Sequence, residues 1–354
     1  MNVEKQLQKD GIIVIEKIPT EIVENIANSV SQKIENTFSD YSLNANEIYN
    51  KLCELNMYKA KMPEGMQEAS YCYKNSSIYF NSNISNEDLV EFAIHECIHY
   101  LQEVKDSNGK LLKMGLSTYS KFKTIGTGLN EAAVQYLSAR IIGIEPDFEK
   151  YYNIDLFTPS PSYYPIECSL LNEFMFFIDE VILFNSTFFS TDDLKNKIIE
   201  FTSISTYNKI IKGFDYITSL EEKIILLNNK LQNTKSNFSK IQEKIDLYKK
   251  NINKNYFELQ NTIITEFWNY KFNQIKTLED IDLFIDKLDQ FGEIIGITDY
   301  YTFFDNFYIE IKNKLDHKAN IIKYGGTETA LSNNKFKILS LLYKLKTRIF
   351  STSK

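Results

Sequence analysis

The stretch LVEFAIHECIHYLQEV, residues 89–104, carries two of the chain's three histidines, His95 and His99. Ser85 and Asp88 stand just before it in the spacing of a helix capping box, so we predict that a helix begins there and runs to about Val104. A helix turns by about 100° per residue, which places positions i and i+4 on one face. The stretch therefore predicts a helix that directs two imidazoles towards one metal ion.

The kind of ion follows from the ligands. Zinc binds neutral imidazole nitrogen well, and catalytic zinc sites use three protein ligands and a water, so a third side chain is needed. Glu131 opens a second predicted helix, in GLNEAAVQYL, and the small residues Ala132 and Ala133 would let that helix approach the first closely. We predict a Zn²⁺ site formed by His95, His99 and Glu131. The alternative is that Glu131 is an ordinary first-turn glutamate, favoured there by the helix dipole.

Other side chains compete less well for the metal. His317, in DHKAN, lies far along the chain and is interpreted as a surface histidine, Glu103 is expected on the His99 helix, and Glu145 is a weaker rival. Cys97 lies two residues from His95 and is predicted to face the core, away from the metal. The alternative to a metal site is a pair of helical histidines that only make polar contacts.

Glu96 follows His95 directly, where its carboxylate would reach water beside the ion rather than the ion itself. HECIH followed downstream by NEAAVQYLS resembles the gluzincin branch of the zincin metallopeptidases, over about residues 70–145. The resemblance implies that two histidines of one helix and a glutamate of a second helix hold zinc. It also implies that the strand Ser77–Asn81 is the edge strand that holds an extended peptide.

The mechanism that this resemblance implies is hydrolysis of a peptide bond. Glu96 would act as the general base and then return the proton to the leaving amine. The developing oxyanion needs a hydrogen-bond donor, for which zincins commonly use Tyr or His. Since no histidine remains nearby, a tyrosine is expected; Tyr164 is the preferred catalytic candidate, and Tyr163 and Tyr119 are alternatives.

Composition narrows the class of protein. The 354 residues are 43% hydrophobic, which allows a sizeable core and argues against disorder. The net charge of −7, without a basic block, does not favour nucleic-acid binding. No signal-peptide pattern or membrane-spanning run is seen, so we expect a cytoplasmic protein without stable membrane insertion, unless it is exported without a cleaved signal. The four cysteines are expected to be reduced and mostly buried.

The rest of the chain is predicted from its periodicity. The expected elements are a strand at 11–18, a helix capped by Thr20, a helix from Asn44 to about Tyr58, a hairpin with arms at 71–73 and 77–81, loops with short elements at 105–128, a helix from about 127 to Gly143, and a helix from Ile166 to about Phe184. The fold class is therefore α+β: a mainly helical, zincin-like catalytic domain with a small β-sheet, followed by an all-helical region.

The helical region contains a heptad pattern. Apolar residues recur in steps of three and four over 219–262, which predicts a long helix packed as a coiled coil. An intramolecular helical hairpin beside the catalytic domain is preferred, and an oligomer is the alternative. A basic amphipathic run follows at 335–350. The expected domains are 1–215, the metallopeptidase domain, and 216–354, the helical domain.

Three functions are compatible with these features. The first is a zinc peptidase that acts on a peptide or protein substrate, which the presence of Glu96 favours. The second is a non-catalytic interaction module on a zincin-like scaffold, which binds a protein partner through the coiled coil. The third is hydrolysis of a non-peptide amide.

Overall fold

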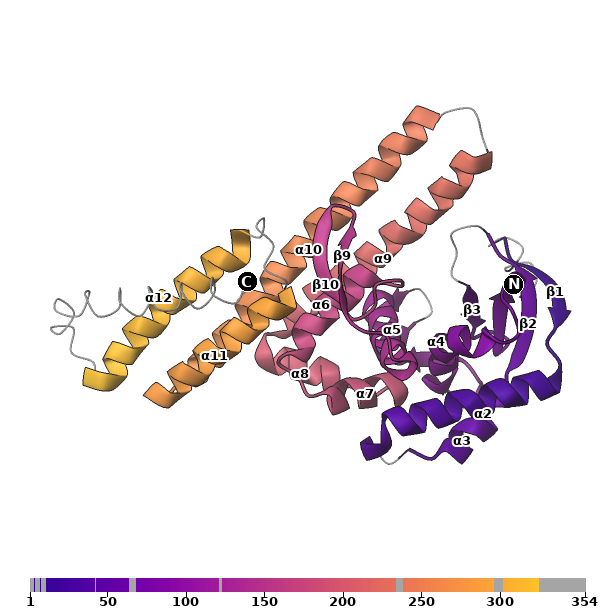
Figure 1. The fold of residues 1–354 in the computed structure, drawn as a ribbon, viewed down its shortest axis with the longest axis horizontal. Helices are drawn as coiled ribbons and strands as arrows, with labels where there is room; N and C mark the ends of the chain where they lie inside the picture. Colours follow the sequence, from indigo (N-terminus) through magenta and orange to yellow (C-terminus); the bar gives the residue numbers. More distant parts are fainter. Residues whose placement is uncertain are drawn as a thin grey trace, which may run out of the picture. The chain divides into compact units, whose positions relative to one another are not determined.

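The computed structural model describes residues 3, 7, 11–41, 43–63, 68–120, 123–233, 238–295 and 302–324. In these residues most of the chain is helical, and the strands form small sheets (Figure 1). The predicted α+β class with a helical C-terminal region is confirmed. The chain divides into two compact units, Met1–Phe267 with Ile294–Thr298 and Trp268–Glu293 with Asp299–Lys354. The boundary predicted at 215/216 instead falls within a helix of the first unit.

The largest sheet lies near the N-terminus and has the strand order β1-β2-β4-β3. Its central strands β2 and β4 are parallel, and the other two pairs are antiparallel. The prediction that Ser77–Asn81 is an edge strand is wrong, because β4 pairs on both sides and β3 forms the edge. The strands are β1 (Ile13–Lys17), β2 (Asn56–Lys61), β3 (Ala69–Cys72) and β4 (Ser77–Asn81).

Helices pack beside this sheet. Helix α2 (Thr20–Thr37) forms where a helix was predicted and buries Val23, Ile26, Val30 and Ile34, although its N-cap is Pro19 rather than Thr20. Helix α3 (Ala45–Leu52) begins after Asn44, where the helix was predicted to start, and the Asn44 side chain caps it by accepting a hydrogen bond from the Asn46 amide. The expected extension to Tyr58 is wrong. Residues 56–61 pair with β1 and β4 instead, because the two-residue alternation of their buried side chains suits a half-buried strand.

The HECIH helix is α4 (Leu89–Leu101), which packs against β3 and β4. The predicted capping residues do interact, since Ser85 Oγ lies 2.7 Å from Asp88 Oδ2 and accepts from the Asp88 amide. The helix ends earlier than expected. Glu103 belongs to a four-stranded sheet of β5 (Glu103–Lys105), β6 (Leu111–Met114), β7 (Ser117–Tyr119) and β8 (Thr124–Ile125).

Helix α5 (Thr127–Ile142) carries Glu131 and matches the predicted bounds. It ends at Gly143, whose positive φ of 86° suits a C-terminal glycine. A hairpin that the sequence did not suggest follows, formed by β9 (Asp147–Tyr151) and β10 (Ile154–Thr158). Tyr152 and Asn153 join its strands with φ values of 49° and 60°, as a tight two-residue turn requires.

The helix predicted from Ile166 to Phe184 is two helices, α6 (Pro165–Met175) and α7 (Glu180–Phe188). Asp179 separates them, because its carboxylate accepts a hydrogen bond from the Val181 amide at 3.0 Å and so caps a new helix. Helix α8 (Asp193–Phe201) follows.

The predicted single heptad helix is also two helices, α9 (Ile204–Asn233) and α10 (Phe238–Gln274), on either side of residues 234–237. The sequence between them is rich in Asn, Thr and Ser, which favour helix less than Leu or Lys do. The two helices lie side by side (Figure 1), and Asn255 Nδ2 of α10 donates to the Gly213 carbonyl of α9 at 3.0 Å. The heptad pattern therefore describes an intramolecular hairpin.

The second unit contains the end of α10 with α11 (Leu278–Ile295) and α12 (Thr302–Tyr324). Trp268 packs edge-on against Phe284 and Phe291, with ring centroids 4.9 and 5.5 Å apart. The basic run predicted at 335–350 lies outside the described residues. No helix in the described part of the chain is both long enough and apolar enough to cross a bilayer.

A carboxyl group is buried between α6 and α10. Glu173 is 1% exposed, and its Oε1 accepts from Gln260 Nε2 at 2.6 Å, while its Oε2 lacks a hydrogen-bond partner. Burial raises the pKa of Glu173 to about 8, although the hydrogen bond from Gln260 opposes this rise. The folded protein therefore prefers the neutral acid.

We expect this preference to make stability depend on pH. The pKa of Glu173 is higher in the folded than in the unfolded chain. The contribution of Glu173 to the free energy of unfolding is therefore full below about pH 4 and is lost as the pH rises to about 8. The loss is at most about 1.4 kcal/mol per pH unit. Glu173→Gln mimics the neutral acid, so its free energy of unfolding should exceed that of wild type at pH 8 and approach it at pH 5. Urea unfolding in the presence of a chelator measures this difference. The exposed Glu258→Gln is the matched control, and equal pH profiles for wild type and Glu173→Gln would contradict the prediction.

Candidate metal centre

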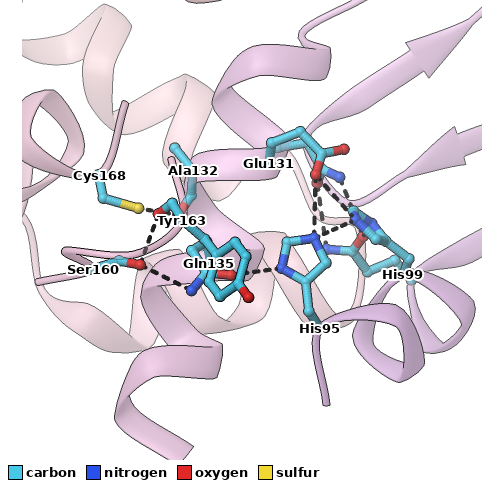
Figure 2. A network of polar contacts seen from close by, with 10 residues as sticks. His95, His99, Glu131, Ala132, Gln135, Ser160, Tyr163 and Cys168 are labelled. Carbon is cyan, nitrogen blue, oxygen red and sulfur yellow. Dashed lines mark hydrogen bonds and ion pairs between the residues drawn. The ribbon is translucent and has the colours of Figure 1, made fainter. Parts of the chain in front are cut away.

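The three predicted ligands converge on one point between α4 and α5 (Figure 2). Nε2 of His95 and Nε2 of His99 are 3.0 Å apart, and Oε2 of Glu131 lies 3.2 Å from the first and 3.3 Å from the second. All three side chains are largely buried, at 12%, 6% and 15% exposed. The donor atoms themselves show whether a metal ion fits this site.

The size of this triangle suits zinc. Zinc holds nitrogen and oxygen ligands at about 2.0–2.2 Å, and at tetrahedral angles neighbouring ligand atoms are then about 3.3–3.6 Å apart. The observed separations of 3.0–3.3 Å are close to the edges of one face of such a tetrahedron. Three protein ligands would leave a fourth position for water or substrate, as in catalytic sites.

The negative charge of Glu131 also requires a cation nearby. A buried carboxylate is costly unless a positive charge compensates it. In the metal-free protein that charge is a proton: burial lowers the pKa of His99, but the charge and hydrogen bond of Glu131 outweigh this effect and raise it to about 9. Burial in turn favours protonation of Glu131, yet the two histidines hold its pKa well below the usual range. A divalent ion would replace this proton, because a ligating imidazole must be neutral.

Hydrogen bonds behind His95 determine which ring nitrogen faces the centre (Figure 2). The Tyr163 carbonyl accepts the only hydroxyl proton of Ser160 at 2.7 Å. The Ser160 oxygen must then accept from Gln135 Nε2, at 2.9 Å, which turns Gln135 Oε1 towards His95 Nδ1, also at 2.9 Å. Nδ1 is therefore the donor, and in the neutral ring Nε2 offers its lone pair to the ligand cluster.

A second relay fixes His99 in the same way. The Leu116 amide donates to Asn130 Oδ1 at 2.9 Å, so this oxygen faces the backbone and also accepts from Gln102 Nε2 at 3.3 Å. Gln102 Oε1 is left to accept from His99 Nδ1 at 3.3 Å. Both imidazoles therefore donate through Nδ1 to a glutamine oxygen, and both Nε2 atoms face Glu131. Such outer partners orient and strengthen metal ligands.

The surrounding backbone makes room for these relays. Gly115, with φ of 55°, lies so close to the Asn130–Gln102 pair that a Cβ would be 2.1 Å from Asn130 Oδ1. At the start of α5, the Asp215 carboxylate of α9 accepts from the amides of Gly126 and Gly128, both at 3.0 Å. The first amides of a helix need such acceptors, because they have no partner within the helix. Glu131 lies one turn further along α5, so the Asp215 contact helps to position it.

Glu96, 5% exposed, is not part of the ligand cluster and lines a cleft together with His95. The predicted tyrosines lie in the surroundings of the centre. The Tyr164 ring is nearly parallel to the His95 ring, with centroids 6.1 Å apart, and Tyr163 lines the cleft while its hydroxyl donates to Glu68 at 2.5 Å. Burial raises the pKa of Tyr119, and the negative charge of Glu131 raises it further by a smaller amount.

The rival residues do not join the cluster. His317 is exposed on α12, Glu145 is exposed after α5, and Glu103 pairs with Lys105 and accepts from the Tyr71 hydroxyl at 2.8 Å. Cys97 is fully buried, as predicted for a core-facing thiol. None of the four cysteines is bonded to another, and two are buried while Cys53 and Cys72 are half-buried.

The sequence alone did not identify the residues of the two relays, Gln135, Ser160, Gln102 and Asn130. One local signal was present, since Gln135 lies four residues after Glu131 on the same helix face and Gln102 lies three after His99. Nothing local marks Ser160, whose partner lies 25 residues away. Asn130 opens the NEAAVQYLS stretch, but its partner Gln102 lies 28 residues away, so its role was not predicted. Comparison of the chain with protein-family models, curated proteins and solved structures found no significant match.

The ligand set predicts the metal content of the purified protein. Wild type should bind about one zinc ion per chain. His95→Ala, His99→Ala and Glu131→Ala should each reduce zinc content sharply, because each removes a donor atom from the same triangle. Elemental analysis after dialysis checks this. His317→Ala is the control and should keep full content; full content in Glu131→Ala would show that another residue is the third ligand.

The relay behind His95 predicts a graded effect on affinity. Gln135→Leu removes the acceptor of the Nδ1 proton and should weaken zinc binding by about 10- to 100-fold. Gln135→Glu keeps an acceptor oxygen and should bind zinc about as tightly as wild type. Competition with a chromophoric chelator measures both affinities, and circular dichroism checks the fold. Wild-type affinity in Gln135→Leu would show that the relay does not orient the ligand.

Proposed function

We propose that this protein is a zinc-dependent hydrolase that cleaves peptide bonds. In this proposal His95, His99 and Glu131 hold the ion, Glu96 is the general base, and Tyr164 supports the oxyanion. The gluzincin-like sequence pattern and the geometry of the three donor atoms both support it.

The observation that carries the proposal is the position of Glu96. A metal with three protein ligands can be purely structural, and a buried carboxylate beside such a site would then serve no purpose. Glu96 instead lines an accessible cleft next to His95 and takes no part in the ligand triangle. A carboxylate in this position can exchange a proton with a water or substrate in the cleft.

Each residue of the centre would have a separate role in the proposed hydrolysis. A bound zinc ion would supply Lewis acidity, which lowers the pKa of water and polarises a carbonyl. Glu96 would take the proton from the attacking water at a carboxylate oxygen and pass it to the leaving amine. Gln135 and Gln102 keep Nε2 of both histidines directed at the ion. Tyr164, beside His95, would donate a hydrogen bond from its hydroxyl to the developing oxyanion.

The decisive variant is Glu96→Gln. It should retain zinc and lose about 100- to 10,000-fold in the rate of peptide hydrolysis, because the general base is removed and the ligands are untouched. Mass spectrometry of a diverse peptide mixture incubated with each protein measures the cleavage. The exposed Glu87→Gln removes the same charge from the segment before α4 and should cleave normally.

Two outcomes would contradict the proposal. Undiminished hydrolysis by Glu96→Gln would exclude this base. Stoichiometric zinc without cleavage of any peptide by wild type would favour the alternative of a non-catalytic interaction module, in which the α9–α10 hairpin contacts the partner.

A further inference from the structure

The cleft beside the metal centre extends along both helices that carry the ligands. Glu91 and Phe92 of α4 precede His95 and Glu96 by one turn and line the cleft. Ser138 and Ile142, which continue the Gln135 face of α5, also line it, as does Ile144 after that helix. Glu68, just before the edge strand β3, and Tyr163 also line it. A substrate group in this cleft would therefore lie directly beside the proposed reaction centre.

The cleft is acidic. Its lining among the described residues includes Glu68, Glu91 and Glu96 and contains no lysine or arginine. Tyr163 donates its hydroxyl to Glu68 and holds this carboxylate in place. The C-terminal end of α5, at Ile142, adds the negative end of a helix dipole, and the positive end of α4 is offset by Glu91 in its first turn. The cleft thus favours a positive charge.

The walls of the cleft are apolar as well. Phe92, Ile142 and Ile144 are half-buried, so their side chains offer apolar surface beside the carboxylates. Ser138 adds a polar atom: it is 1% exposed, and its hydroxyl has no hydrogen-bond partner among the residues that the structure describes. A buried hydroxyl of this kind can still donate to or accept from a group that enters.

We propose that this cleft is the subsite for a basic side chain, lysine or arginine, of the peptide substrate next to the bond that is cleaved. A long apolar stem with a cationic head matches apolar walls that carry carboxylates. Glu68 and Glu91 are the specificity-determining residues, and their carboxylates pair with the cationic head. This inference rests on the proposed peptidase function and goes further by naming the substrate class.

The test uses binding, so that it does not depend on turnover. Zinc-loaded full-length Glu96→Gln protein is titrated with fluorescein-labelled alanine pentapeptides that carry one central lysine, norleucine or glutamate, and anisotropy gives each affinity. We expect the lysine peptide to bind at least about tenfold more tightly than the norleucine peptide, and the glutamate peptide to bind most weakly. Adding Glu68→Gln and Glu91→Gln should remove the preference for lysine, whereas adding Glu87→Gln should leave it unchanged.

Equal binding of the lysine and norleucine peptides, or a preference that survives both glutamine substitutions, would overturn the proposal. Circular dichroism confirms that the variants are folded. The two proposals can fail separately. If the protein prefers the lysine peptide but wild type cleaves no peptide, the peptidase function is rejected and the cationic subsite is kept. If wild type cleaves peptides without this preference, the peptidase function is kept and the cationic subsite is rejected.

Discussion

The buried carboxylate of Glu131 is the constraint on which the centre depends. A charge in this position between two packed helices is tolerated only with a cation beside it, and the two Nε2 atoms of α4 supply that partner as a proton or as a metal ion. The packing of α4 against α5 and the Asp215 cap at the start of α5 bring the carboxylate to within 3.3 Å of both rings.

The outer hydrogen bonds decide how the centre can be used. A histidine pair beside a glutamate can be a simple charge network, in which either ring nitrogen carries the proton. Here each Nδ1 faces a glutamine oxygen whose orientation is traced back to a backbone group, the Tyr163 carbonyl in one relay and the Leu116 amide in the other. Two lone pairs directed at one point are expected of a ligand set. The hydrogen-bond acceptors of both Nδ1 atoms are neutral side-chain amides, so the relays themselves bury no charge.

The acidic cleft and the metal centre share α4 and α5. One face of α4 presents Glu91 and His95, and one face of α5 presents Glu131, Gln135 and Ser138, because residues three and four apart lie one above the other. In the proposed function, chemistry and substrate selection would therefore use the same pair of helices, which would keep their relative geometry fixed.

Local pattern determined much of this protein: the HECIH helix, the start and end of the Glu131 helix, the β3–β4 hairpin and the α+β class. It failed where local preference was ambiguous, since residues 56–61 form a strand, Asp179 divides one expected helix, and the heptads of 219–262 belong to two helices rather than one, although the preferred intramolecular hairpin is what they form. Only the tertiary structure decided that β3 is the edge, that Glu131 meets both imidazoles, and that distant Ser160 and Asn130 fix their tautomers, because these depend on contacts between residues far apart in sequence.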